Sequence, residues 1–242
     1  MTPMVDATQA RKNRLIAALP PGSLERWLPH LKPIQMDLGA PVYEAGEMLP
    51  HVYFPTTAIV SLLHVLKNGD TAEIAVVGND GIVGVSLFMG GFTTSTRAVV
   101  QSAGRALLLP TAVLQSEFER GGPVMHLLLR YTQALISQMT QTAACNRHHN
   151  IEQQLCRWLL LSLDRTGGIH LNMTQELISN MLGVRREGVT QAASSLQRKG
   201  LIRYSRGHIT ILDRAGLERC SCECYEVVKT EYQRLLPEGT AT

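Results

Sequence analysis

The stretch that decides the fold is Met173–Ile211, MTQELISNMLGVRREGVTQAASSLQRKGLIRYSRGHITI. Thr174 is a favourable N-cap, and it opens a short helix whose apolar residues can form one buried face. Gly183 follows where the chain must turn sharply, which glycine does at little cost because it adopts positive φ angles. A second helix is expected from about Arg185 to Lys199. Two helices joined by such a turn form a helix-turn-helix.

Two short β segments follow the second helix, at 201–204 and 208–211, and Ser205-Arg206-Gly207 joins them. A hairpin in this place is the wing of a winged helix-turn-helix. The second helix has an apolar side for the protein core, and its outward side is polar and charged. The outward residues are Arg185, Arg186, Glu187, Thr190 and Gln191.

These outward residues are of the types that read DNA in the major groove. Arginine donates two hydrogen bonds to guanine, glutamine pairs with adenine, and glutamate accepts from cytosine. We therefore expect double-stranded DNA as a partner, with bases read by Arg186, Glu187, Thr190 and Gln191. Phosphate contacts are expected from Arg185, Thr174, Ser179 and Arg206. The alternative is that the arginines only form a solvated surface.

Charge is concentrated in the same stretch. The whole chain has 23 lysines and arginines against 20 acidic residues, a net charge of +3. Residues 174–209 alone carry six basic and two acidic side chains, a net charge of +4. The basic excess is thus local, which is typical of a segment that contacts a polyanion.

The residues that precede this stretch have a different composition and a different pattern of apolar residues. From Pro33 to about Pro110, short β-branched runs alternate with glycines and predict an all-β barrel or sandwich. Residues 8–31 have apolar residues at helical spacing, broken by Pro20-Pro21-Gly22, and predict two short helices.

A long helix is expected from Pro123 to about Cys145, between the β region and the helix-turn-helix. Its apolar stripe suits a seam between two helices of a homodimer, and the alternative is that it packs only on its own barrel. The stripe consists of Leu128, Tyr131, Leu135, Met139 and Thr142. A further amphipathic helix begins at Ile151 and ends at Gly167-Gly168. We expect three parts: a sensor domain at 1–122, a dimerisation helix and hinge at 123–148, and the winged helix-turn-helix with a C-terminal helix at 149–242.

Together these features resemble the Crp/Fnr superfamily of bacterial transcription regulators, over about Leu24 to Ile211. In the family an Arg-Glu pair follows the turn glycine, and Arg186-Glu187 occupy that place. Gln191 lies where cyclic-AMP-binding members read a base with arginine, which predicts a shifted site preference. The resemblance implies an α+β fold with a cyclic-nucleotide-binding-like barrel of the jelly-roll (double-stranded β-helix) type. It also implies a dimeric, sequence-specific regulator of an inverted-repeat operator, with RNA polymerase and a small-molecule effector as further candidate partners.

The resemblance fails at the cyclic-nucleotide site. Cyclic-AMP binders use a Gly-Glu-x-Gly segment for the ribose and an inward arginine for the phosphate. In this chain Ile82 replaces the glutamate, and Thr96 takes the place of the arginine. Arg97 lies one residue along, so it is expected to point out of the pocket because alternate strand residues face opposite sides. The candidate effector pocket therefore consists of Ile82, Gly84, Thr96 and Arg97, and control by cyclic AMP is not expected.

Five cysteines lie at positions 145, 156, 220, 222 and 224. Oxygen-sensing relatives hold an iron-sulfur cluster mostly on N-terminal cysteines, so no such cluster is expected. Residues 213–236 predict one C-terminal helix, in which Cys220 and Cys224 share a face and Cys222 points elsewhere. Zinc sites usually have other spacings, so we expect no metal site and assign these cysteines to helix packing. Reduced cysteines and the absence of a signal peptide predict a cytoplasmic protein.

Other function classes find little support in the sequence. No segment approaches the roughly 18 uninterrupted apolar residues of a membrane helix, so no membrane partner is expected. Phosphate-binding loops and the motifs of hydrolases and metalloproteases are missing, so we do not expect an enzyme. The competing hypothesis is a small-ligand sensor whose helix-turn-helix has weak or lost DNA affinity.

Overall fold

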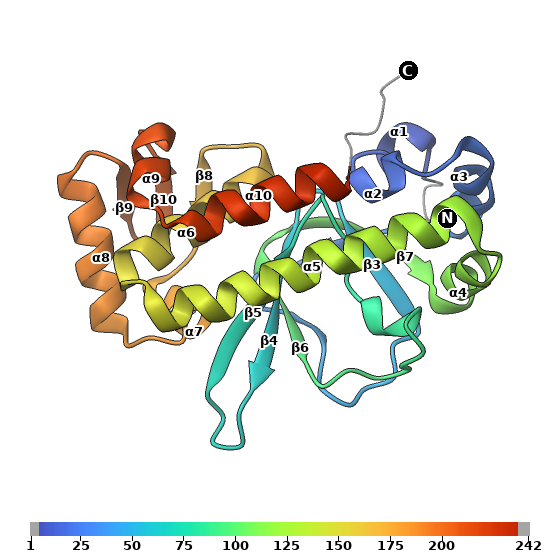
Figure 1. Ribbon diagram of the computed structural model, residues 1–242, viewed down its shortest axis with the longest axis horizontal. Helices are drawn as coiled ribbons and strands as arrows, with labels where there is room; N and C mark the ends of the chain where they lie inside the picture. The colour runs from blue at the N-terminus through green and yellow to red at the C-terminus, as the bar shows by residue number, and fades with distance from the viewer. Residues whose placement is uncertain (1–4, 237–242) are drawn as a thin grey trace.

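The computed structural model describes residues 5–236 (Figure 1). Three short helices and a 3-10 turn come first: α1 (Ala7–Ala10), α2 (Arg14–Ala17), α3 (Pro21–Trp27) and η1 (Leu28–His30). The sequence predicted only two helices here. The additional break is at Asn13, whose buried side chain caps α2 and donates from Nδ2 to the backbone oxygens of Pro55 and Gly81. This residue fastens the N-terminal helices to the barrel.

Two antiparallel sheets form the barrel, in the orders β1-β7-β3 and β2-β6-β4-β5. The strands are β1 (Lys32–Met36), β2 (Pro41–Tyr43), β3 (His51–Pro55), β4 (Ile59–Val65), β5 (Thr71–Val77), β6 (Arg97–Ser102) and β7 (Gly104–Pro110). A 3-10 turn, η2 (Val85–Leu87), lies between β5 and β6. Both the β-rich N-terminal region and the mixed α+β class agree with the sequence prediction.

Helix α4 (Thr111–Glu119) leads into α5 (Gly122–His148), which runs along most of the long axis of the molecule beside the barrel (Figure 1). Pro123 near the start of α5 suits a first turn, where no intrahelical bond needs its missing amide proton. The predicted long helix is therefore present. Within residues 5–236, no helix combines the length and the apolarity needed to cross a membrane.

Helix α6 (Ile151–Thr166) follows after a link of two residues, His149 and Asn150, and is buried between the barrel and the C-terminal half. Trp158 Nε1 donates to Glu73 Oε1 on β5 at 3.0 Å, and Gln101 Nε2 on β6 donates to Ser162 Oγ at 2.9 Å. Ser61 Oγ on β4 lies 2.5 Å from Glu73 Oε2 and 2.7 Å from Gln101 Oε1. All five side chains are buried. A continuous polar network thus connects the barrel to α6.

The winged helix-turn-helix follows α6. Its elements are β8 (His170–Asn172), α7 (Gln175–Leu182), α8 (Arg186–Arg198), β9 (Ile202–Ser205) and β10 (His208–Ile211). Thr174 caps α7 by accepting from the Leu177 amide at 3.1 Å, and Gly183 turns the chain with φ of 64°. Both roles agree with the sequence prediction. The wing has a third strand that was not predicted, because β8 pairs with β10 in the order β8-β10-β9.

The prediction of a single C-terminal helix over residues 213–236 is wrong. The chain forms α9 (Arg214–Cys220) and α10 (Glu223–Leu235), separated by Ser221 and Cys222 with extended backbone at ψ of 165° and 167°. Helix α10 then turns back and lies beside α5 (Figure 1). Because the helix is interrupted, Cys222 takes the N-cap position of α10 instead of a place on the far side of one continuous helix.

Candidate DNA interface and effector pocket

Helix α8 presents one polar face to solvent. The exposed residues are those expected from the sequence: Arg185 at the N-cap, then Arg186, Glu187, Thr190 and Gln191. The opposite face is buried and consists of Val189, Ala192, Ala193 and Leu196. Amphipathic packing therefore leaves the N-terminal half of α8 free to enter a major groove, as the second helix of a helix-turn-helix does.

Close packing against α6 sets the position of α8. A Cβ atom at Gly188 would lie 2.6 Å from Cδ1 of Ile151, the first residue of α6. Only glycine allows this approach without a shift of the Ile151 side chain. Because α6 is itself held by the polar network on the barrel, the exposed face of α8 has a defined orientation relative to the barrel.

The wing is a tight hairpin with an arginine at its tip. Arg206 and Gly207 both have positive φ, 49° and 83°, which is the pattern of a two-residue type I′ turn. The Arg206 side chain is exposed. Tyr204 holds the hairpin in place, since its hydroxyl donates to the Met173 carbonyl at 2.8 Å and its amide donates to Gln197 Oε1 at 2.9 Å.

One predicted phosphate contact is wrong. Ser179 is only 6% exposed, and its hydroxyl donates to the Glu176 carbonyl at 2.8 Å. It lies on the side of α7 that packs inward, so it does not reach a DNA backbone. Thr174, by contrast, is exposed at the N-terminus of α7, where helix amides favour an anion.

The residues predicted as a dimer seam on α5 belong instead to the chain's own core. Tyr131 shows why: its hydroxyl donates to the Ile82 carbonyl at 3.2 Å, and its ring meets Tyr232 of α10 edge-on at 6.5 Å. Met139 is half-buried against the same core. The others, all buried, are Leu128, Leu135 and Thr142. The alternative, that this stripe packs on its own chain, agrees with the structure.

A second stripe on α5 faces solvent. Its members recur at alternating steps of three and four residues: His126, Leu129, Gln133, Ile136, Thr140 and Ala143. Leu129 is 45% and Ile136 is 55% exposed. The sequence did not single out this stripe because the buried stripe contains more apolar residues, and apolar periodicity alone does not distinguish an intrachain face from an interchain one.

Two of the four candidate pocket residues lie in packed surroundings. Ile82 is fully buried in the apolar core. A Cβ atom at Gly84 would lie 3.2 Å from Val52 Cγ1 and 3.3 Å from Leu87 Cδ1. Apolar side chains therefore occupy the place where a ribose-binding carboxylate would be expected.

The other two candidates, Thr96 and Arg97, already have partners within the chain. Thr96 Oγ1 lies 3.2 Å from the Tyr43 hydroxyl and 2.8 Å from Thr94 Oγ1. Burial raises the pKa of Tyr43, which therefore stays protonated. Arg97 Nε lies 3.0 Å from Glu44 Oε1, on a side chain that is one-third exposed.

Strand β6 explains the direction of Arg97. Ala98 and Val100 belong to the barrel core, whereas Val99 and Gln101 pack toward α6 on the other face. Arg97 alternates with Ala98 and so lies on the outer face with Val99. A phosphate bound inside the barrel would not meet this guanidinium.

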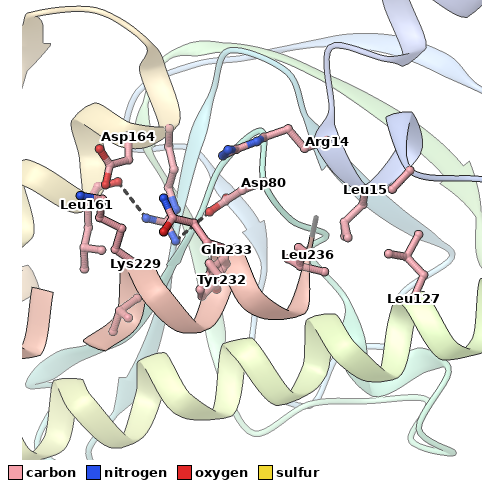
Figure 2. Close-up of a pocket in the computed structure, with 13 residues that line it drawn as sticks. Arg14, Leu15, Asp80, Leu127, Leu161, Asp164, Lys229, Tyr232, Gln233 and Leu236 are labelled. Carbon is pink, nitrogen blue, oxygen red and sulfur yellow. Dashed lines mark hydrogen bonds and ion pairs between the residues drawn. The ribbon is translucent and has the colours of Figure 1, made fainter. Parts of the chain in front are cut away.

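A cavity of ≈ 450 Å³ lies elsewhere, between α2, α5, α6 and α10 (Figure 2). Leu15, Leu127 and Leu161 contribute apolar walls. The charged lining residues are Arg14, Asp80, Asp164, Arg165 and Lys229. Asp80 and Arg165 form a buried ion pair at 3.0 Å. The cavity therefore combines an apolar wall with several polar groups, as small-molecule sites do.

Two family models match successive parts of the chain. The cyclic nucleotide-binding domain matches residues 34–120, and the Crp-like helix-turn-helix domain matches residues 153–220. No curated protein matches the sequence.

Solved structures have a similar fold over most of this chain. FixK2 from Bradyrhizobium japonicum has 17% identity and a TM-score of 0.66, over 79% of this chain and 98% of that chain. A CRP-family transcriptional regulator from Thermus thermophilus has 20% identity and a TM-score of 0.61, over 77% and 95%. The c-di-GMP-responsive global regulator CLP of Xanthomonas campestris has 16% identity and a TM-score of 0.62, over 80% and 100%.

A cyclic-nucleotide-binding-type barrel, a long helix and a winged helix-turn-helix with an exposed second helix define a class of transcription regulators. Both domains occur here in the order of that class. The chain belongs to the Crp/Fnr family of transcription regulators.

Proposed function

We propose that this regulator binds an inverted-repeat operator as a homodimer, with half-sites about one helical turn apart. The exposed face of α8 is the observation that carries the proposal. In it, Arg186, Glu187, Thr190 and Gln191 meet base edges. Arg185 at the start of α8, Thr174 at the start of α7 and Arg206 at the wing tip contact phosphates.

The dimer forms through the solvent-facing stripe of α5, not through the stripe that the sequence suggested. Leu129, Ile136 and Ala143 recur at the seven-residue spacing of a coiled coil, with Gln133 and Thr140 between them. Burying this stripe against a second copy removes two exposed large apolar side chains from water, which favours association.

Cyclic AMP does not control DNA binding in this proposal. The barrel has no carboxylate at Ile82, and Arg97 lies on the outer face with Glu44. The cavity of Figure 2 is the better candidate for a small effector, because Arg14 and Asp80 from the N-terminal part of the chain and Asp164 and Arg165 of α6 all line it. A ligand there would shift the orientation of α6 only if it bound one orientation more tightly than another.

The proposed setting is the cytoplasm, with no catalytic step, and RNA polymerase is a further candidate partner. The competing function is a small-ligand sensor that no longer binds DNA. Specific affinity at physiological salt separates the two, because nonspecific phosphate binding falls steeply with salt.

The test is fluorescence anisotropy at physiological salt with a duplex selected from random sequences, without ligand and then with cyclic AMP, cyclic GMP or cyclic di-GMP. Tight specific binding that does not change with nucleotide supports the proposal. Specific binding only with a cyclic nucleotide would show that the barrel retains that site. If the selection yields no specifically bound duplex under any of these conditions, the result favours the competing function.

A further inference from the structure

Four side chains with metal-binding atoms meet at the junction of α5, α6 and α10. Cys145 lies in the last turn of α5, and His149 is its C-cap. Cys222 is the N-cap of α10, and Cys224 lies in its first turn. Their ligand atoms all lie within 4.8 Å of one another. The three cysteines are buried and form a cluster separate from the two larger cores.

Two of the distances between ligand atoms have the spacing of one tetrahedral ion. Cys145 Sγ lies 3.5 Å from Cys222 Sγ, and Cys224 Sγ lies 3.7 Å from His149 Nδ1. Zinc bonds of about 2.3 Å to sulfur and about 2.0 Å to nitrogen place tetrahedral ligand atoms roughly 3.5–3.8 Å apart. An iron-sulfur cluster needs more widely spaced ligands, because several iron and sulfide atoms lie between them. The set therefore matches a single ion.

The surroundings support His149 and the thiolates as ligands. Nδ1 of His149 faces the cysteines, and its Nε2 lies 3.3 Å from Glu223 Oε2. A histidine bound to zinc through one nitrogen commonly has a carboxylate at the other, which fixes the ring and its tautomer. Arg157 is buried on α6, and its guanidinium donates to Thr142 Oγ1 at 3.2 Å, three residues before Cys145 on α5. Zn²⁺ with three thiolates and a neutral histidine carries one negative charge, which Arg157 would balance.

We propose that Cys145, His149, Cys222 and Cys224 bind one Zn²⁺ ion. The sequence predicted no metal site, because zinc ligands usually have other spacings and Cys222 was expected to point away from Cys220 and Cys224 on one continuous helix. The interruption before α10 brings Cys222 and Cys224 to the same side. One ligand pair comes directly before α6 and the other directly after α9, so the two pairs flank the segment that contains the winged helix-turn-helix. The ion therefore fastens both ends of the DNA-binding unit at the end of α5, the point about which that unit would rotate.

The test begins with metal content of the full-length protein purified under reducing conditions without added metal. Inductively coupled plasma mass spectrometry should find one zinc per chain. After removal of zinc by a chelator, added Co²⁺ should give the charge-transfer and ligand-field bands of a tetrahedral thiolate site. Cys222→Ser should lose both signals. Glu223→Gln keeps all four ligands and should bind Co²⁺ about 10- to 100-fold more weakly.

The matched control is Cys220→Ser, because Cys220 lies two residues from Cys222 but outside the cluster. This variant should keep one zinc and the cobalt spectrum. Glu223→Gln covers the case in which Cys222→Ser does not fold. The proposal is overturned if reduced wild-type protein binds neither zinc nor cobalt, if Cys222→Ser retains the metal, or if Cys145 and Cys222 are recovered as a disulfide instead.

Discussion

Arg186 is the residue at which the proposed base reading can be tested most directly. It is the first residue of α8 and is exposed. Arg186→Ala should weaken specific binding by about 1–3 kcal/mol and relax the preference at one base pair in each half-site. Anisotropy with a set of single-substitution operators measures both effects. Arg198→Ala, at the far end of the same helix, is the control and should leave base preference unchanged. An equal loss on all sequences would make Arg186 a phosphate contact.

Asp80 is a residue whose loss should be costly to the fold. It pairs at 3.0 Å with Arg165, which is 2% exposed and also donates to Gln138 Oε1 and the Leu161 carbonyl. Asp80→Asn removes the carboxylate that pairs with this buried guanidinium and should lower the free energy of unfolding by about 3–5 kcal/mol. Urea denaturation measures this change. Asp70→Asn, in an exposed turn, should have almost no effect. Equal stability of the two variants would show that Arg165 does not depend on Asp80.

Local chemistry explains which residues the sequence could identify. The cap at Thr174 and the turn at Gly183 follow from bonds and dihedral angles within a few residues, and both predictions agree with the structure. The burial of Ser179 and the pairing of Asp80 with Arg165 depend on how distant segments pack. Nothing in the neighbouring residues encodes those contacts.

At the scale of elements, α5 tests which stripe forms the dimer. Ile136→Glu places a charge in the solvent-facing stripe and should shift the protein from dimer to monomer at micromolar concentration, measured by light scattering after size-exclusion chromatography. Val227→Glu makes a similar change at a 40% exposed position on α10 and should leave the dimer intact. A dimer that persists in Ile136→Glu, or that dissociates equally in both variants, would contradict the proposed seam.

Helices and strands with a single apolar face were predicted more accurately than helix α5, which has two apolar stripes. The wing and α8 have one buried face each, so periodicity was enough to find them. Helix α5 has a buried stripe and an exposed one, and the sequence pattern emphasised the buried one. The break between α9 and α10 was missed because Ser221 and Cys222 are compatible with a helix, and packing against α5 selects the extended backbone instead.

At the scale of the whole molecule, the buried network around Glu73 links folding to pH. The Ser61 hydroxyl has one proton but lies within hydrogen-bonding distance of both Glu73 Oε2 and Gln101 Oε1. The network is complete when Glu73 is protonated and donates to Ser61, which then donates to Gln101. Burial raises the pKa of Glu73 to about 7, against the opposing effects of its bonds to Ser61 and Trp158 and of the charges on Arg157 and Arg165.

The sign of the resulting pH dependence follows from proton counting. Between the ordinary pKa of 4.5 and the folded-state pKa of about 7, the folded chain holds a proton on Glu73 that the unfolded chain has lost. This contribution to the free energy of unfolding therefore falls as pH rises through that interval, and it is constant above it. One pKa unit corresponds to about 1.4 kcal/mol, so the decrease is on the order of 3 kcal/mol.

Glu73→Gln should remove this decrease and make the protein more stable than wild type at pH 8, by about 2–3 kcal/mol. The glutamine amide can donate to Ser61 as the protonated acid does, and its oxygen can still accept from Trp158, so the contact between barrel and α6 is kept. Denaturant titrations of both proteins at pH 5, 6, 7 and 8 provide the measurement, with Glu47→Gln as an exposed carboxylate control. Parallel pH profiles for wild type and Glu73→Gln would mean that Glu73 is ionised in the folded protein throughout this range. The charge would then be stabilised by Arg157 and Arg165. The contribution of the network to the free energy of unfolding would be the same from pH 5 to pH 8.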